Sequence, residues 1–195
     1  MYRAVLDTCA LVPGRRRDFL LQLAAEEAYA PLWGSGVLFE LDYVLARLDA
    51  KRGRDGSDER RRHLFQQMKR AFPGAEINAP KDRAYDYGLS DPDDGHVAHA
   101  AILGKADAIV TDDSRAGFKT SHVLIEAGID IDHPHEFAAY TVAAHPEAGV
   151  RALVAMSLRM VTPPQSPQQI LAELRDRYGM DEVAEILTPL LPGVE

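Results

Sequence analysis

The chain has 195 residues, of which 46% are hydrophobic and 27% charged, and its formal net charge is −8. This composition is typical of a globular protein with one core and an appendage. The absence of any apolar run of about 18 residues excludes a membrane-spanning helix, and the N-terminus lacks a signal-peptide pattern. A single cysteine, Cys9, cannot form an internal disulfide, so we expect a cytoplasmic protein. The negative charge disfavours unassisted binding to nucleic acid unless positive charge gathers locally.

Short apolar segments alternate with segments of helical periodicity along the first 140 residues. Strands are predicted at 3–6, 75–78, 108–111 and 128–132, and helices at 17–29, 37–48, 58–72, 94–103 and 134–144. Gly34-Ser35-Gly36 is interpreted as a turn between two helices. The alternation predicts an α/β fold with a mainly parallel central sheet.

Beyond residue 140 the chain becomes apolar and helical, and we predict an extension over 141–195 that contains no strand. Pro163-Pro164 separates two of its helices. The second of these begins with Ser166 as N-cap, Pro167 at the first position and Gln169 at the third, and it ends at Gly179. Their apolar residues would pack on the rest of the protein or bind a partner, and we expect packing.

Acidic residues occupy positions where the predicted elements begin or end. They are Asp7 after the first strand, Glu40 early in the helix at 37–48, Asp94 at the start of the next predicted helix, and Asp112-Asp113 after the strand at 108–111. In parallel sheets, ligands bind outside the carboxyl ends of the strands. We therefore expect these acids to converge at one edge of the sheet.

Converging carboxylates require protons or cations. Two unit charges about 4 Å apart repel by about 1 kcal/mol in water and by about 4 kcal/mol at an effective dielectric of about 20. Oxygen ligands suit Mg²⁺ and Mn²⁺, and such ions activate water for phosphodiester cleavage. The alternative for any single acid is a capping or dipole role at a helix start, and Asp94 in particular has that alternative.

Four segments resemble the motifs of PIN domains, and they occur in the same order. Val-Leu-Asp-Thr-Cys-Ala-Leu at 5–11 resembles the opening Leu-Asp-Thr-Asn-Val-Leu, and residues 38–45 resemble the second helix that bears an acid. Residues 91–100 and 109–113 are similar to the two remaining motifs. The resemblance covers about residues 1–140 and is to the VapC-type toxins of bacterial toxin–antitoxin modules, including those with a helical C-terminal extension.

The resemblance implies a three-layer PIN-like nuclease domain over 1–140, an extension over 141–195, and an endoribonuclease that uses Mg²⁺ or Mn²⁺. It also implies RNA as substrate, a cognate antitoxin and a homodimer. The implied catalytic residues are Asp7, Glu40, Asp94 and Asp113, and the implied metal ligands are Asp7, Asp94 and Asp113, with Asp112 sharing or taking the fourth role. Thr8 and Thr111 match threonine and small hydroxyl positions of the motifs and are expected at the substrate.

Two positions depart from the family pattern. Cys9 replaces the usual asparagine, and Gly117 stands where a second acid is usual. The first change puts one polar contact in doubt, and the second leaves Asp112 and Asp113 as competing candidates.

Two basic stretches provide the local positive charge that a chain with negative net charge needs to bind nucleic acid. Arg15, Arg16 and Arg17 follow the first motif, and Arg60–Arg62 lie within a second stretch at 51–70. Either stretch would hold a phosphate backbone, or form a solvated face, or pair with an acidic partner. His96 with His99 and His133 with His135 do not show the second ligand pair that a zinc site needs, so zinc is not predicted.

Two rival functions remain at the level of sequence. Cys9 to Arg15 fits the Cys-x5-Arg pattern of a phosphatase, but Pro13 removes a backbone donor from a loop that must offer N–H groups to phosphate. A non-catalytic PIN-like binding module is the other rival, and the presence of all the acids gives it little support.

Overall fold

A computed structural model describes residues 1–53 and 56–191, which form two compact units. The sheet unit joins Tyr2–Val12 to Pro31–Asp132, and the helical unit joins Met1 and Pro13–Ala30 to the chain from His133 onward. Each unit therefore takes segments from distant parts of the sequence. The domain boundary expected at residue 140 stays a prediction.

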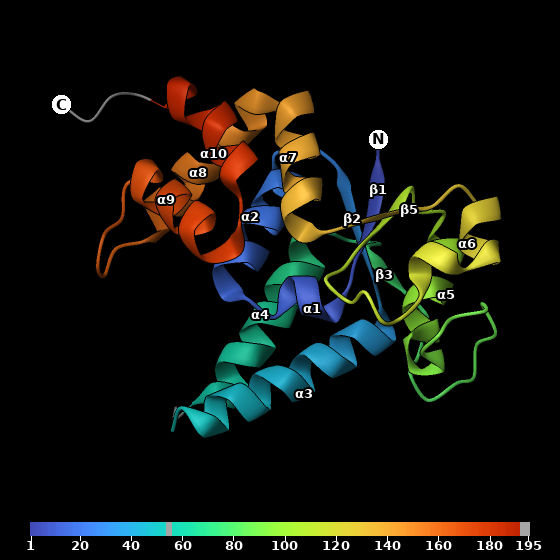
Figure 1. Ribbon diagram of the computed structural model, residues 1–195. Helices are drawn as coiled ribbons and strands as arrows, with labels where there is room; N and C mark the ends of the chain where they lie inside the picture. Colours follow the sequence, from blue (N-terminus) through green and yellow to red (C-terminus); the bar gives the residue numbers. More distant parts are fainter. Residues whose placement is uncertain (54–55, 192–195) are drawn as a thin grey trace. The chain divides into compact units, whose positions relative to one another are not determined.

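A five-stranded sheet with the order β3-β2-β1-β4-β5 forms the core of the sheet unit (Figure 1). The strands are β1 (Arg3–Leu6), β2 (Ala30–Gly34), β3 (Glu76–Ile77), β4 (Ala108–Val110) and β5 (Asp130–Asp132). The pairings β1–β4, β4–β5 and β2–β3 are parallel, which confirms the predicted fold class. Residues 4–6 and 108–110 are fully buried, as apolar strands of a parallel sheet are expected to be.

Strand β2 was not predicted, because Gly34-Ser35-Gly36 indicates a turn when the segment is read alone. In the structure Gly34 ends the strand with φ −77° and ψ 152°, and the next helix begins at Ser35. Gly36 is required by close packing instead. A Cβ on Gly36 would lie 2.6 Å from His96 Cδ2 and 2.8 Å from the carbonyl oxygen of Ala79. The interpretation of 34–36 as a turn is therefore wrong.

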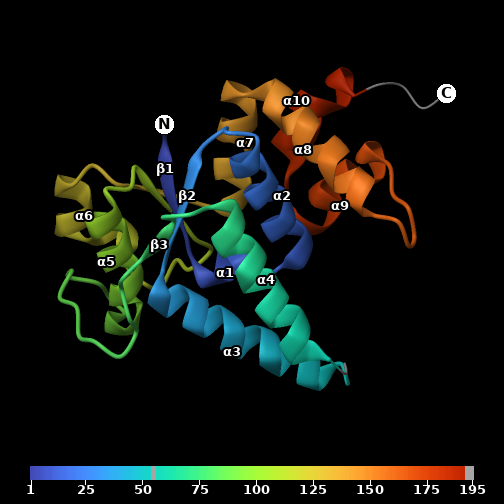
Figure 2. The ribbon, with the colours of Figure 1, turned by 180° about the vertical axis from the view of Figure 1, so that it is seen from behind.

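The sheet unit also contains helices and 3-10 turns. They are α1 (Thr8–Leu11), α3 (Ser35–Lys51), α4 (Ser57–Ala71), α5 (Gly95–Gly104) and α6 (His122–Glu126), with 3-10 turns η1 (Pro92–Asp94) and η2 (Phe118–Thr120). Helix α5 packs on β1, β4 and α3, and α3 contacts α4, the two helices diverging from the end of α3 in both views (Figure 2). The long helices α3, α4 and α5 confirm the predictions, whereas the short α1 and α6 were not predicted.

The helical unit contains α2 (Gly14–Ala25), α7 (Pro134–Ala144), α8 (Pro146–Arg159), α9 (Pro167–Tyr178), α10 (Asp181–Leu187) and the 3-10 turn η3 (Thr188–Leu190). Helix α2 packs on α8, α8 on α9, and α10 on α7. The predicted capping box of Ser166 and Gln169 is present, and Gly179 ends α9 in the left-handed conformation. From residue 141 to residue 191 the regular elements are helices, apart from an isolated bridge between Val161 and Pro164.

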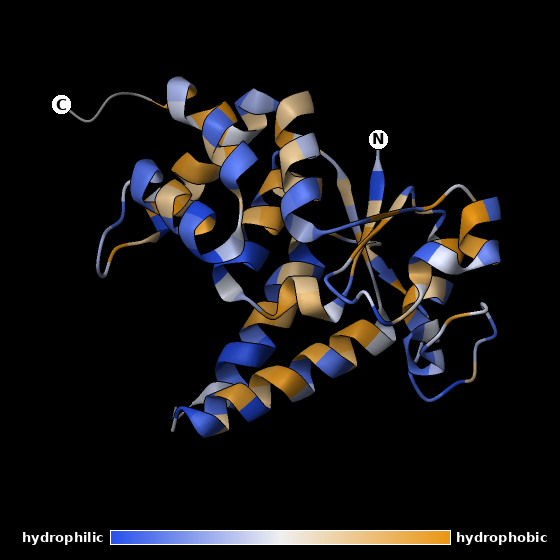
Figure 3. Ribbon diagram, in the orientation of Figure 1, coloured by the Kyte–Doolittle hydropathy of each residue, from blue (hydrophilic) through white to orange (hydrophobic). Residues whose placement is uncertain are grey.

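The elements differ in hydropathy (Figure 3). Orange marks the strands at the centre of the sheet, blue dominates the first turns of α4, and orange segments recur along α3. Within residues 1–53 and 56–191, no helix combines the length and apolarity needed to cross a membrane.

Candidate active site

Asp7 lies directly after β1, where its backbone N–H donates to the carbonyl of Val110 on β4 at 3.1 Å. Its carboxylate is 6% exposed and accepts bonds from Thr8 N at 2.6 Å, Thr111 Oγ1 at 2.7 Å and Cys9 Sγ at 3.2 Å. Burial raises the pKa of Asp7, and these three hydrogen bonds oppose the rise. Asp7 is thus a fixed, buried carboxylate at the carboxyl end of the central strands.

Glu40 reaches the same region from α3. Its Oε2 accepts the hydroxyl of Thr8 at 2.8 Å and lies 3.3 Å from His96 Nε2, while Oε1 pairs with the ammonium of Lys81. Burial alone raises the pKa of Glu40, but the contacts from His96, Lys81 and Thr8 outweigh burial and lower the pKa to about 2. Glu40 is therefore an ionised group whose two oxygens are already engaged by the chain.

His96 is 1% exposed, and its two ring nitrogens have different contacts. Its Nδ1 lies 2.9 Å from the carbonyl oxygen of Asp93, which can only accept, so Nδ1 is a hydrogen-bond donor. The Nε2 atom then faces Glu40 at 3.3 Å, without the alignment of a hydrogen bond. Because the distance is short and the alignment poor, we treat this contact as electrostatic.

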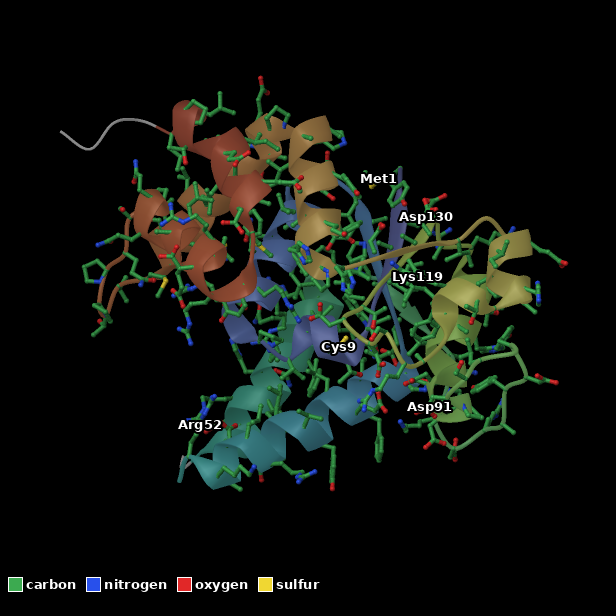
Figure 4. The ribbon with its side chains drawn as sticks, in the orientation of Figure 1. Met1, Cys9, Arg52, Asp91, Lys119 and Asp130 are labelled. Atoms are coloured by element: carbon green, nitrogen blue, oxygen red, sulfur yellow. The ribbon has the colours of Figure 1, made fainter. Side chains whose placement is uncertain are left out.

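Asp94 lies at the N-cap position of α5, yet its side chain makes no capping hydrogen bond. The capping role left open by the sequence is therefore not the role its side chain has here. Burial, and then the charges of four carboxylates, together raise the pKa of Asp94 to about 6; these carboxylates are Asp7, Asp91, Asp113 and Glu40. Asp7 follows β1, Glu40 lies on α3 and Asp113 follows β4, so charges from three separate elements act on Asp94, while Asp91 precedes it in the same turn. In Figure 4, the labels on Cys9 and Asp91 locate residues close in sequence to Asp7 and Asp94.

The two candidates for the fourth acid differ in environment. Asp113 is half-buried, its backbone N–H donates to Thr111 Oγ1 at 3.0 Å, and its Oδ1 accepts from the backbone of Arg115 and Ala116. Asp112 is exposed, and its backbone N–H donates to Cys9 Sγ at 3.0 Å. Asp113 is also one of the carboxylates that raise the pKa of Asp94. These contacts favour Asp113.

The donor set fits a divalent cation of the magnesium type. Asp7, Asp94 and Asp113 supply hard oxygen atoms, and the pKa of Asp94 is raised by burial and then by negative charges that a cation would neutralise. Among the described residues, no three His, Cys, Asp or Glu side chains are close enough to form a ligand group as they stand. Since Mg²⁺ commonly keeps several waters beside one or two carboxylates, these acids would share the ion partly through water.

Lys81 and His96 were not identified as members of the site from sequence. Lys81 follows β3 in a loop without motif spacing, and it lies 41 residues from Glu40. Its own burial lowers the pKa of Lys81, but the hydrogen bond to Glu40 and nearby carboxylates raise it overall. The position of His96, two residues after Asp94, was a usable signal, but His96 was considered only as a zinc ligand.

Cys9 occupies the position that is usually asparagine, and its thiol bridges the ends of two strands. Its Sγ lies 3.2 Å from Thr111 Oγ1 and 3.2 Å from Asp7 Oδ2. Burial, and then the charge of Asp7, raise the pKa of Cys9 to about 12. A phosphatase of the Cys-x5-Arg type needs a thiolate, so this environment argues against that rival.

The arginines expected at the substrate lie at the start of α2, in the helical unit. Arg15 pairs with Glu173 at 3.0 Å and donates to Gln165 at 2.7 Å, which ties α2 to α9 and the loop before it. Arg16 is buried, and Arg17 lies 3.7 Å from Asp18. These contacts stabilise the helical unit. RNA contact by Arg15–Arg17 stays a prediction.

A groove of about 670 Å³ lies between α3, α4 and β3. It is lined mainly by apolar and aromatic side chains, among them Trp33, Leu38, Phe65 and Phe72. Its lining includes none of Asp7, Glu40, Asp94 and Asp113, so it gives no support to the chemistry of the acids.

The class of protein is defined by a parallel α/β sheet with Asp7 after β1, Glu40 on α3, Asp94 before α5 and Asp113 after β4. The chain belongs to the PIN domain family, whose model matches residues 3–115, more than half of the chain. PIN domains are in general metal-dependent nucleases that act on RNA. Among curated proteins and among solved structures, comparison finds no match to this chain.

The network around Glu40 gives a first testable prediction. A carboxylate whose pKa is lowered from 4.5 to about 2 stabilises the fold above pH 4.5, and this stabilisation is lost as pH falls from 4.5 toward 2. After a discount for partial exposure, Glu40→Gln is expected to cost about 1–2 kcal/mol at pH 7. The measurement is urea unfolding of both proteins from pH 8 to pH 3. Glu59→Gln, which removes an exposed acid on α4, is the matched control. If the difference in unfolding free energy between wild type and Glu40→Gln does not decrease below pH 4.5, the prediction is contradicted.

Proposed function

We propose that this protein is an endoribonuclease that hydrolyses RNA phosphodiesters with Mg²⁺ or Mn²⁺ held by Asp7, Asp94 and Asp113. One observation carries the proposal: burial, and then the charges of Asp7, Asp91, Asp113 and Glu40, raise the pKa of Asp94 to about 6. Such a concentration of negative charge opposes folding unless a cation or proton neutralises it. When bound, the metal would supply charge neutralisation at the phosphate and an activated water.

The chain's own residues prepare the acids for this chemistry. The hydroxyls of Thr8 and Thr111 donate to Glu40 and Asp7, so each orients one carboxylate. Lys81 and His96 hold Glu40 ionised, and we assign Glu40 the role of a positioning residue that fixes Thr8 beside Asp7. Asp113 is oriented by the backbone N–H groups of Arg115 and Ala116. In-line attack at phosphorus then needs a positioned water and neutralised charge.

The proposed function predicts strict dependence on added metal. Protein treated with EDTA and then dialysed is expected to cleave single-stranded RNA at least about 100-fold more slowly than protein with Mg²⁺ or Mn²⁺. The measurement is the rate of appearance of new RNA ends, and restoration by Mn²⁺ is the control for damage during treatment. Cleavage that continues at full rate in EDTA would overturn the assignment of the acids to a metal.

The resemblance to VapC-type toxins extends the proposal. We infer a toxin of a toxin–antitoxin module, a cognate antitoxin that covers the site, and a homodimer. The order of the four motifs and the helical segment after residue 140 support this inference.

The non-catalytic binding module remains the second candidate. Cys9 in place of the usual asparagine is the observation in its favour. Against it, the Cys9 thiol keeps a polar contact to Asp7, and the acids remain close around Asp94.

A further inference from the structure

Helix α3 presents a row of exposed aromatic side chains next to the acids. Phe39 is 70% exposed and Tyr43 is 58% exposed, and the two are one helical turn apart. The guanidinium of Arg47, one turn further on, lies over the ring of Tyr43 at 5.7 Å from its centroid. We call Phe39, Tyr43 and Arg47 the α3 stripe.

The stripe runs beside the site on the same rigid element. At about 100° per residue, Phe39, Tyr43 and Arg47 span less than a quarter of the helix circumference, and Glu40 lies about 20° outside that sector, on the side of Arg47. The opposite side of the helix is buried, with Val37 and Leu41 fully covered. A ligand on the stripe would thus lie next to Glu40 and, through Thr8, next to Asp7.

Charge near the stripe differs from the charge of the whole chain. Helices α3 and α4 carry seven Lys and Arg against five Asp and Glu, whereas the chain carries 22 against 30. Glu40 pairs with Lys81, which lies outside the two helices, whereas Asp42 pairs at 2.8 Å with Arg61, one of the seven cations, and leaves the excess unchanged. The helix pair therefore offers local positive charge to a polyanion.

We propose that the α3 stripe is a stacking platform for the bases of unpaired RNA and that it leads the strand into the acid site. Exposed aromatic rings with an arginine, on a locally basic surface, are the features by which proteins hold single strands without regard to sequence. Paired bases hide their faces in a duplex, so the platform selects single-stranded substrate. This inference rests on the proposed nuclease function.

The test is binding of short fluorescent oligoribonucleotides to full-length protein that carries Asp7→Asn, so that the probe is not cleaved. Two probes of equal length are compared by fluorescence anisotropy, one with all its bases and one with abasic sites throughout. Phe39→Ala and Tyr43→Ala are each expected to weaken binding of the first probe about five- to tenfold. Binding of the abasic probe should not change. Phe39→Tyr and Tyr43→Phe keep the rings and should keep the affinity.

Tyr140→Ala is the matched control, since Tyr140 is an equally exposed tyrosine (61%) on α7, a helix that carries none of the acids. Equal loss of affinity for both probes would overturn the proposal, because the rings would then act without stacking. Unchanged RNA affinity together with a change in oligomeric state by light scattering would overturn it in favour of an interface between copies. If wild-type protein cleaves RNA and the alanine variants bind RNA with unchanged affinity, the stacking platform is rejected but the nuclease function is not. Absence of any cleavage by wild type would reject the proposed function as well.

Discussion

Replacing Asp7 by asparagine is expected to reduce metal-dependent RNA cleavage by at least about 100-fold, the loss typical when a group that stabilises developing charge is removed. Asp7 is the most buried of the acids and is fixed by Thr8, Thr111 and Cys9. Asparagine keeps the size and one oxygen but loses the charge that a cation requires. The measurement is the initial rate of RNA cleavage at saturating Mn²⁺, and growth of cells that express either protein is a second readout.

The fold is expected to survive this substitution. Burial penalises the charged form of Asp7, so a neutral side chain removes that penalty while the Thr111 hydroxyl rotates to accept. Unchanged thermal unfolding of Asp7→Asn would separate loss of chemistry from loss of structure. Asp112→Asn, which removes an exposed acid near the site, should retain most of the activity. Equal cleavage rates for wild type and Asp7→Asn would reject the role of Asp7.

Asp94→Asn is expected to abolish cleavage to a similar degree and, without metal, to stabilise the protein. The pKa of Asp94 is raised from 3.8 to about 6, so the folded state binds the proton more tightly than the unfolded state. Above pH 6 the ionised carboxylate therefore destabilises the fold, and this effect disappears as pH falls toward 4. The full shift corresponds to about 3 kcal/mol, which we reduce to about 1–2 kcal/mol because the side chain is partly exposed.

Urea unfolding in EDTA measures this prediction directly. The stability gain of Asp94→Asn should be present at pH 7 to 8 and absent at pH 4, opposite in sign to the effect at Glu40. Added Mg²⁺ should stabilise wild type and leave Asp94→Asn nearly unaffected, because binding to the folded state alone raises stability. A variant that is less stable than wild type at pH 8 would show that Asp94 has a structural role instead.

Local patterns in the sequence predicted much of the frame. The apolar runs at 3–6 and 108–110 and the periodicity of α3, α4 and α5 gave correct elements, because hydrophobic spacing reflects the side of each element that is buried. The capping box at Ser166 was equally local, since its two hydrogen bonds join residues three apart. The expectation that Asp7 and Asp113 share one edge rests on equally simple reasoning, because strand ends in a parallel sheet lie on the same side.

Other features depend on residues far apart in the chain. Gly36 indicates a turn by itself, and only the approach of His96 and Ala79 shows that it is required for packing. Similarly, Arg15 appears free in a basic run, but it pairs with Glu173, 158 residues away.

The acids also show which properties follow from local sequence and which depend on distant residues. The sequence by itself placed Asp7, Glu40, Asp94 and Asp113 at the ends of elements, because strand and helix boundaries follow from short-range patterns. The tertiary structure decided their different states: Glu40 is ionised by Lys81 and His96, while Asp94 has a raised pKa among other carboxylates. Burial and the charges of neighbours set a pKa, and both arise only when distant segments pack together.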